Sequence, residues 1–264
     1  MSELPQTIEN TQPDPWTELR RLTPARIALG RSGASLPTRE VLAFGIAHAQ
    51  ARDAVQAALD VAALESALLP LGLPILQVNS AAPTRSAYLA RPDWGRRLDP
   101  DARKELTSLA RSTGPELLFV IGDGLSAIAP QHHAAPLLMA LLPLLQDFSV
   151  GPLVIATQAR VALADEIAEC LGARLVVCLI GERPGLSSPD SLGAYVTAAP
   201  RVGRHDAERN CVSNIRPEGL SPELAAAQLA GLIRAALAAG ISGVALAYAP
   251  LEPLATLDAL PPSG

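Results

Sequence analysis

Short, uninterrupted apolar runs alternate with helix-like segments along most of this chain. The runs have the length and composition of buried strands, and they lie at residues 75–78, 116–124, 152–157, 174–181 and 243–248. Segments with a helical repeat lie at about 132–147, 163–172 and 221–239. Strand followed by helix, repeated several times, is typical of a parallel sheet with helices on both faces. The pattern predicts an α/β fold with a Rossmann-like, doubly wound parallel sheet.

The first part of the chain has a different pattern, which is helical throughout. A helix is predicted from Arg39 to about Leu59, because Thr38 is suited to cap it and apolar residues recur in steps of three and four. A second helix is predicted over residues 61–69. We expect the apolar face of the first helix to be buried. Its members are Val41, Phe44, Ala47, Val55 and Ala58.

Four parts are therefore predicted along the chain. Residues 1–15 combine prolines with polar residues and are expected to form a flexible tail. An N-terminal helical segment follows over residues 16–74, and the Rossmann-like domain covers residues 75–249. Residues 250–264 are rich in Pro, Leu and Ala and are predicted to be a C-terminal tail.

Composition and charge exclude several classes of protein. Hydrophobic residues make up 49% of the chain and charged residues 18%, which is typical of a folded protein. The net charge of -5 offers no field that would attract a polyanion, so no nucleic-acid partner is expected. The longest uncharged stretch, residues 124–146, is interrupted by three prolines, and we expect no membrane span. The 3 cysteines fit neither a zinc site nor a disulfide framework, and the first residues do not resemble a secretory signal, which favours an intracellular protein.

In an open α/β sheet, ligands bind beyond the carboxyl ends of the strands, so the loops there are candidate sites. The loop after the run at 116–124 contains Gly122, Gly124 and Ala127 in a G-x-G-x-x-A pattern, which could be a dinucleotide fingerprint. The next helical repeat starts only after Pro130, and the next strand does not end in an acidic residue. A tight turn with a ligand-facing Asp123 is favoured, and a stand-alone dinucleotide-binding oxidoreductase stays the alternative function.

Three later loops also follow predicted strands or lack a regular repeat. Residues 158–162 could be a plain strand-to-helix turn. Residues 181–188 combine an acid, a base, a proline and two glycines, which favours contact with a polar ligand. Residues 206–219 have neither a helical nor a strand repeat and are predicted to be ordered coil that binds something. Cys211 in this segment could be a nucleophile, although a small apolar role is commoner for a lone cysteine.

The sequence offers little self-contained catalytic machinery. Ser126 and the pair His132–His133 lack the G-x-S-x-G turn that exposes a hydrolase serine. No grouping of His, Cys, Asp and Glu has the spacing of metal ligands. A D-x-H-x-x-G motif, whose histidine would bind the cobalt of a corrin, is also absent. The residues therefore predict a ligand-binding module without catalytic residues or metal ligands of its own.

Five blocks of sequence, spread over most of the chain, resemble the small subunit (light chain) of ethanolamine ammonia-lyase. They are ARIALGRSGASLPT (25–38), YLARPDWGRRL (88–98), VIGDGLSA (120–127), GERPGLSSPDSLGAY (181–195) and DAERNCVSNIRPEGL (206–220). The two longest blocks are the most specific.

The resemblance implies an adenosylcobalamin-dependent lyase that converts ethanolamine to acetaldehyde and ammonia. It implies a Rossmann-like small subunit, whose cobalamin-binding domain is residues 75–249, and a hetero-oligomer with a TIM-barrel large subunit that holds the substrate. The family's cofactor contacts carry over to Arg160, Val161, Glu182 and Cys211. Cobalamin keeps its own benzimidazole on cobalt in this family, which agrees with the missing D-x-H-x-x-G motif. A cytoplasmic location is expected, or a bacterial microcompartment if the host makes one.

Overall fold

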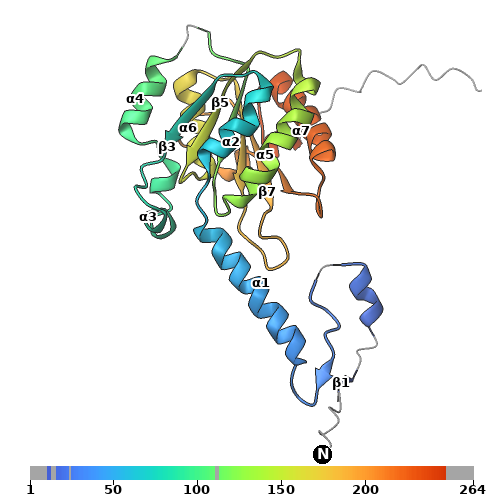
Figure 1. The fold of residues 1–264 in the computed structure, drawn as a ribbon. Coiled ribbons are helices and arrows are strands. Elements are labelled where there is room, and N and C mark those ends of the chain that lie inside the picture. Colours follow the sequence, from blue (N-terminus) through green and yellow to red (C-terminus); the bar gives the residue numbers. More distant parts are fainter. Residues whose placement is uncertain (1–10, 13–15, 24, 111–112, 248–264) are drawn as a thin grey trace, which may run out of the picture.

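A six-stranded sheet forms the centre of the part of the chain that the computed structural model describes, which comprises residues 11–12, 16–23, 25–110 and 113–247. The strands lie in the order β3-β5-β4-β6-β7-β8. Figure 1 labels β3, β5 and β7 of this sheet. Strands β3 to β6 are parallel to one another, whereas β7 is antiparallel to β6 and β8 is antiparallel to β7. Their bounds are β3 Ile75–Asn79, β4 Leu117–Gly122, β5 Val150–Thr157, β6 Leu175–Gly181, β7 Leu192–Ala198 and β8 Asn210–Ile215.

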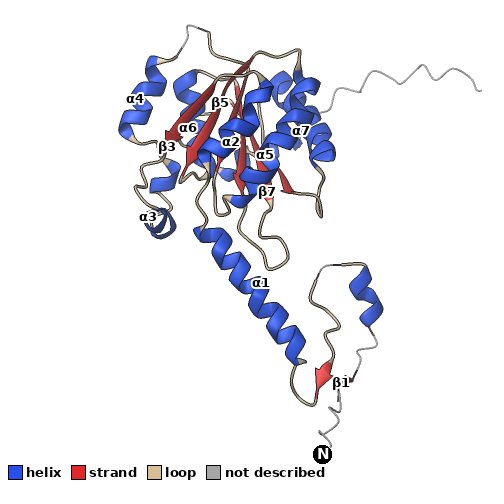
Figure 2. Cartoon of the chain, in the orientation of Figure 1, coloured by secondary structure: helices blue, strands red, loops and turns tan. Residues whose placement is uncertain are grey.

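Helices cover both faces of this sheet (Figure 2). One face packs against α2 (Val61–Leu68), α5 (Ile128–Leu141) and α7 (Pro222–Ala239). The other face packs against α4 (Pro100–Ser108) and α6 (Val161–Leu171). The shorter elements of the body are η2 Leu69–Leu71, α3 Arg85–Ala90, η3 Trp94–Arg96, η4 Leu142–Leu145, η5 Asp206–Glu208 and α8 Val244–Ala247.

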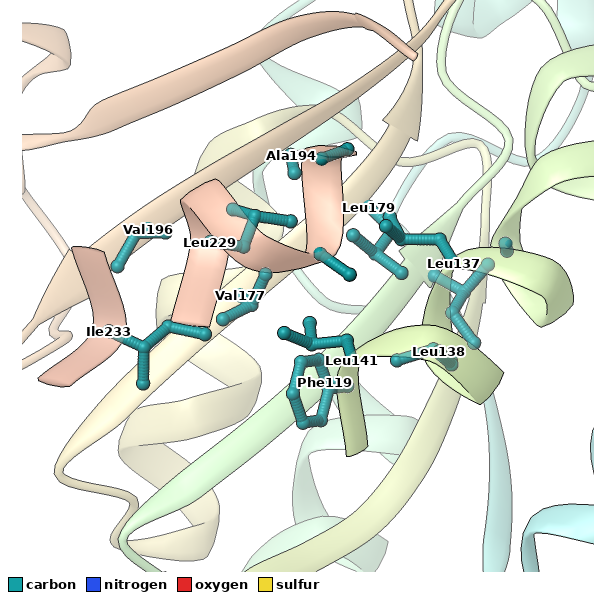
Figure 3. Close-up of a cluster of buried hydrophobic side chains, with 14 of the residues drawn as sticks. Phe119, Leu137, Leu138, Leu141, Val177, Leu179, Ala194, Val196, Leu229 and Ile233 are labelled. Carbon is teal, nitrogen blue, oxygen red and sulfur yellow. The ribbon is translucent and has the colours of Figure 1, made fainter. Parts of the chain in front are cut away.

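The core is divided between the two faces because successive residues of a strand point to opposite sides. Phe119 of β4 and Val177 of β6 face α5 and α7, where they meet Leu141 and Ile233 (Figure 3). Leu118 and Val120, the neighbours of Phe119 in β4, point to the opposite face and pack toward α6. Every residue of β4 and β6 is buried, which is why the sequence of these strands is apolar without interruption.

The prediction of an α/β fold with helices on both faces is confirmed, but the prediction of a wholly parallel sheet is wrong. Residues 192–198, which had no predicted element, and residues 210–215, which lie in the segment predicted to be ordered coil, form β7 and β8. A parallel neighbour needs a crossover connection, usually a helix, but the segments that lead into β7 and β8 contain only the short η5. Each of these strands therefore turns back and pairs antiparallel with the strand before it in the chain. A mixed sheet of this kind does not establish the Rossmann-like description.

The strand predicted at 243–248 is also wrong, since residues Val244–Ala247 form the short helix α8. Two hydrogen bonds connect Ser242 and Gly243, which precede α8, to residues at and after η5. The Ser242 hydroxyl donates to the Glu208 carbonyl at 2.5 Å, and the Asn210 side chain accepts from the Gly243 N–H at 2.6 Å. A short apolar run has no period that would separate a strand from a helix.

The first helix of the chain, α1 (Thr38–Gln56), projects away from the body (Figure 1). At its far end lie η1 (Thr17–Arg21) and a small ribbon of β1 (Thr11–Gln12) and β2 (Arg31–Ser32). We refer to residues 16–23 and 25–56 as the N-terminal arm. Its parts are joined by an ion pair between Arg20 and Glu40 at 3.4 Å and by Arg26 stacked on Phe44. The predicted tails at 1–15 and 250–264 lie outside the described residues, apart from β1.

The helix in the arm is confirmed, but its predicted burial is largely wrong. Only Ala47 and Ala54 of α1 are buried, whereas Val41 is 52% exposed and Phe44 48% exposed. The arm carries a dense group of exposed large apolar side chains. They are Trp16, Leu19, Leu22, Ile27, Leu36, Val41, Leu42, Phe44 and Ile46.

Among the described residues, α5 and η4 together (Ile128–Leu145) are long and apolar enough to cross a membrane. Half of this segment is buried, and α5 lies against the sheet and α7. Its apolar character therefore has an explanation in the core of the fold. α1 and the segment Val61–Leu71 pass the same test only when joined, and they are bent by 82°.

Candidate functional site

The carboxyl ends of β4, β5 and β6 meet at one edge of the sheet, because the three strands are parallel neighbours. Ligands of α/β proteins bind at this edge. The loops that follow the strands surround a hollow of about 460 Å³, which we call the carboxyl-edge hollow. Its lining includes Tyr88, Gly124, Arg160, Val161, Glu182 and Tyr195.

Three of the four predicted cofactor residues line this hollow, although they come from different loops. Arg160 and Val161 follow β5, and Glu182 follows β6. Cys211 lies on β8 directly opposite Tyr195 of β7, so it is one residue away from the lining. The fold thus brings together residues that are far apart in the sequence, and their binding role stays a prediction.

Arg160 stands at the start of α6, whose first turn has no side-chain cap. Its N–H donates to the Gly95 carbonyl at 2.8 Å, and its guanidinium lies 4.3 Å from the centre of the Tyr88 ring. The Nε atom is buried and has no hydrogen-bond partner among the described residues. An uncapped helix start attracts electron-rich groups, and the positive charge of Arg160 strengthens that attraction.

A second hollow, of about 250 Å³, adjoins the first and shares Arg160 and Val161 with it. Arg96, Arg204 and Arg209 also line this hollow. Arg209 forms a buried ion pair with Asp165 of α6, in which its Nη1 atom lies 2.6 and 2.7 Å from the two carboxylate oxygens. The surroundings of Arg160 are therefore rich in arginine.

Glu182 uses one of its two carboxylate oxygens within the chain. Oε2 accepts from the Ser191 hydroxyl at 2.5 Å and from the Asn214 N–H at 3.3 Å. The Glu182 N–H donates to the Ser191 carbonyl at 2.9 Å, which fixes the backbone as well. Oε1 accepts no hydrogen bond from the described residues. The side chain is thus oriented while one oxygen is available to a ligand.

Cys211 is an exposed residue, and it lies directly opposite Tyr195 on the paired strand. Desolvation raises the pKa of the Cys211 thiol, an effect that the Tyr195 hydroxyl partly offsets. A nucleophilic cysteine needs the opposite shift, toward thiolate at neutral pH. The direction of this pKa shift therefore favours a binding contact over the nucleophile considered from sequence.

The expectation that Asp123 faces a ligand is wrong. Asp123 is 3% exposed, and its two oxygens accept the N–H groups of Gln158 and Ala159 at 2.9 and 2.8 Å. Burial raises the pKa of this carboxyl, and the two N–H donors and Arg85 counteract that shift. Asp123 is therefore a support for the loop that carries Arg160.

The glycine pattern that suggested a dinucleotide fingerprint has a packing explanation. Gly124 has a φ of 60°, and a Cβ there would lie 2.1 Å from the Gly181 carbonyl oxygen. A Cβ on Gly181 would in turn lie 1.9 Å from the Ser126 carbonyl oxygen. Both positions are glycine because the loops after β4 and β6 touch through their backbones. The alternative of a dinucleotide-binding oxidoreductase is not supported.

Ser126 and His133 serve the same region without forming a catalytic triad. The Ser126 hydroxyl donates to the Pro189 carbonyl at 2.7 Å, and His133 Nε2 lies 3.2 Å from Asp190. The first contact connects the end of the 182–191 loop to the turn before α5, and the second connects it to α5 itself. Within the described residues, no three His, Cys, Asp or Glu side chains are grouped as for a metal ion.

Two residues that the sequence argument missed lie beside the hollow. Arg85 is 3.4 Å from Asp123 and donates to the Gly124 carbonyl at 2.8 Å. Tyr88 is fully buried, and the guanidinium groups of both Arg85 and Arg160 lie over its ring. Both residues lie on α3, the helix that follows β3, rather than in the loop directly after the strand, so a search of the loops alone does not find them. Tyr88 begins one of the five blocks that carry the resemblance, which was the only available signal.

Comparison with known proteins gives a consistent result. The profile of a family described as ethanolamine ammonia-lyase light chain matches residues 13–247. The chain is 55% identical over 250 residues to the ethanolamine ammonia-lyase small subunit of Azotobacter vinelandii, covering 93% of this chain and 91% of that protein. It is 57% identical over 231 residues to the small subunit of Rhodopseudomonas palustris, covering 87% and 88%. For the small subunit of Ralstonia nicotianae the identity is 54% over 245 residues, covering 91% of each protein.

The raised pKa of Cys211 gives a testable pH dependence. Alkylation by iodoacetamide requires the thiolate, so labelling of Cys211 should be slow at pH 7 and should increase only above the ordinary thiol pKa of about 8.5. The rate is measured by mass spectrometry of the peptide that contains Cys211. The same peptide in urea-denatured chain is the control and should titrate at the ordinary value. A midpoint below that of the denatured chain would contradict the assignment.

Proposed function

The chain belongs to the family of ethanolamine ammonia-lyase small subunits, and on that premise we propose that it binds adenosylcobalamin at an interface with a large subunit. The assembled enzyme converts ethanolamine to acetaldehyde and ammonia by radical chemistry. The observation that supports the binding role is the convergence of Arg160, Val161 and Glu182 on the carboxyl-edge hollow. Cys211 is added to the site through its contact with Tyr195.

The side chains present fit the chemistry of a cobalamin. A corrin ring carries amide groups at its edge, which offer both N–H donors and carbonyl acceptors. Glu182 Oε1 is an acceptor without an internal partner, and a bond to a carboxylate is stronger than one between neutral groups. Arg160 supplies donors that suit amide carbonyls or the phosphate of the nucleotide loop. The neighbouring arginine-lined hollow suits that phosphate by charge.

The contribution of this chain to the reaction is binding, orientation and exclusion of water. The chemistry that adenosylcobalamin supplies when bound is radical hydrogen abstraction following cobalt–carbon cleavage. Glu182 and Arg160 would hold the ring edge, while Val161 and Cys211 would provide close contact. A closed interface would keep water from the reactive species. Substrate binding belongs to the large subunit in this proposal.

The N-terminal arm supports the requirement for a large partner. Nine large apolar side chains of the arm are exposed in the single chain. Exposed apolar surface of this density marks an interaction site in soluble proteins. We propose a hetero-oligomer of large and small subunits in which this surface is covered. The proposed location is the cytoplasm, or a bacterial microcompartment where the host makes one.

Activity should depend on the large subunit. Purified chain with adenosylcobalamin and ethanolamine should release no acetaldehyde, because its described residues provide neither a triad nor a metal cluster. Acetaldehyde is measured by coupling to alcohol dehydrogenase and NADH absorbance. The same chain co-expressed with the large subunit is the positive control. Turnover by the chain alone would refute the proposal.

The chain without its partner should self-associate, because an obligate interface buries more than about 2,000 Å². In size-exclusion chromatography with light scattering it should elute as a heterogeneous species. Phe44→Ser should sharpen this profile, whereas Leu109→Ser should not, since Leu109 is equally exposed but lies on the body at α4. A sharp, stable wild-type monomer would argue against the obligate interface.

Loss of the Glu182 carboxylate should weaken cobalamin binding without preventing assembly. A hydrogen bond to a charged group contributes ~1.5–3 kcal/mol, so Glu182→Ala should raise the Kd of the assembled complex ~10- to 100-fold, and Glu182→Gln should raise it less. Binding is followed by absorbance titration of the complex.

The control for this titration is Glu105→Ala, an exposed acid on α4 outside the carboxyl-edge hollow. It should leave the Kd unchanged. An equal Kd for Glu182→Ala and wild type would remove Glu182 from the site. Failure of both Glu182 variants to assemble would assign the residue to the structure, through Ser191 and Asn214.

A further inference from the structure

The loop before α6 is held by side chains that contribute little to the two hydrophobic cores. Its first residue, Gln158, has a φ of 53°, which is unfavourable for a residue with a side chain. Asp123 accepts the N–H groups of Gln158 and Ala159, and the Tyr88 hydroxyl donates to the Ala159 carbonyl at 3.0 Å. Both backbone polar groups of Ala159 are therefore bound by side chains from other segments.

Tyr88 acts on the next residue as well. Its ring lies 4.7 Å from the guanidinium carbon of Arg85 on α3 and 4.3 Å from that of Arg160. A cation over an aromatic face is attracted to it, most strongly when both are shielded from water. Tyr88 is 0% exposed and belongs to neither of the two core clusters. Its contacts therefore act mainly on the loop and on the two arginines.

Arg85 joins this cluster to the rest of the chain. Its Nη1 atom lies 3.4 Å from Asp123 and donates to the Gly124 carbonyl, while its Nε donates to the Val55 carbonyl in the last turns of α1 at 2.8 Å. Burial raises the pKa of Tyr88 to about 12, so its hydroxyl remains a donor over the whole working pH range.

We propose that Tyr88 and Asp123 are positioning residues that fix the direction of Arg160 and the start of α6 at Val161, beside the carboxyl-edge hollow. The inference rests on the proposed function, because the group that Arg160 and Val161 are positioned to meet is the cobalamin. Tyr88 acts through the Ala159 carbonyl and the Arg160 guanidinium. Asp123 acts through the N–H groups of Gln158 and Ala159.

The test uses the assembled complex of this chain with its large subunit. Tyr88→Phe removes only the bond to Ala159 and should raise the Kd for adenosylcobalamin ~2- to 10-fold. Tyr88→Leu also removes the ring beneath Arg160 and should raise it ~10- to 100-fold. Asp123→Asn should fall in the same range as Tyr88→Leu, because an amide supplies one acceptor oxygen where the carboxylate supplies two. The KM for ethanolamine should not change for any of these variants.

A second measurement examines the loop itself, without cofactor. Hydrogen exchange of the peptide covering residues 157–163 should be faster in all three variants than in wild type. Asp123→Asn weakens the bonds to the N–H groups of Gln158 and Ala159, and the two Tyr88 variants release the Ala159 carbonyl, so the loop should open more often in each case. The matched control is Leu64→Ala, a fully buried leucine of the α2 face. It should lower the melting temperature of the complex while leaving both the Kd and the exchange of this peptide unchanged.

Arg160→Ala separates positioning from general stability. If Tyr88 acts through Arg160, adding Tyr88→Leu to Arg160→Ala should raise the Kd by much less than Tyr88→Leu does in wild type. Full additivity, or an unchanged Kd in Tyr88→Leu, would overturn the proposal. So would a Kd change in Leu64→Ala as large as that in Tyr88→Leu. A wild-type complex that binds no adenosylcobalamin would instead refute the proposed function.

Discussion

The loop after β4 is in direct contact with the two neighbouring loops that carry the candidate binding residues. On one side, the Gly124 backbone touches Gly181, the last residue of β6 before Glu182. On the other side, the Asp123 carboxylate binds the backbone that leads to Arg160. A Cβ at Gly124 would separate the first pair, and loss of the carboxylate would release the second. The distance between Glu182 and Arg160 is therefore set by one short turn.

The buried carboxylate at that turn is stabilised by three hydrogen-bond donors. Burial of an ionised group without partners costs several kcal/mol. Asp123 meets this cost with two backbone N–H groups and the Arg85 guanidinium. The same arrangement satisfies the N–H groups of Gln158 and Ala159, which strand pairing does not reach. Stability of the turn and geometry of the site thus depend on the same bonds.

The sequence predicts the four parallel strands but not β7 and β8, the two strands that pair antiparallel. β4 and β6 are apolar throughout, so their runs stand out from the surrounding residues. β8 alternates between exposed and partly buried residues over most of its length and contains two asparagines, so it lacks an apolar run. Pairing with β7 decides its conformation, and that pairing is a tertiary contact. The burial of α1 was also mispredicted, because an apolar face on a helix does not indicate whether the same chain covers that face.

The candidate site shows a similar division. Arg160, Glu182 and Cys211 could be proposed because they follow strands, lie in polar segments or match a family block. Tyr88 and Arg85 were not found, because they act on the loop from α3 and are brought there only by the folded chain. A motif marks residues that meet a ligand more readily than the residues that hold them in place.

The partial internal use of Glu182 bears on how tightly the site could bind. Freezing a flexible side chain on binding costs about 0.5–1.5 kcal/mol. Glu182 is already fixed through Oε2, and Arg160 is already stacked on Tyr88, so much of this cost is met when the chain folds. What remains available, Oε1 and the guanidinium donors, is directed before the ligand arrives. Such an arrangement favours a large ligand with many weak amide contacts most. The free energy of each weak contact would otherwise be largely cancelled by the entropy cost of ordering the side chain that makes it.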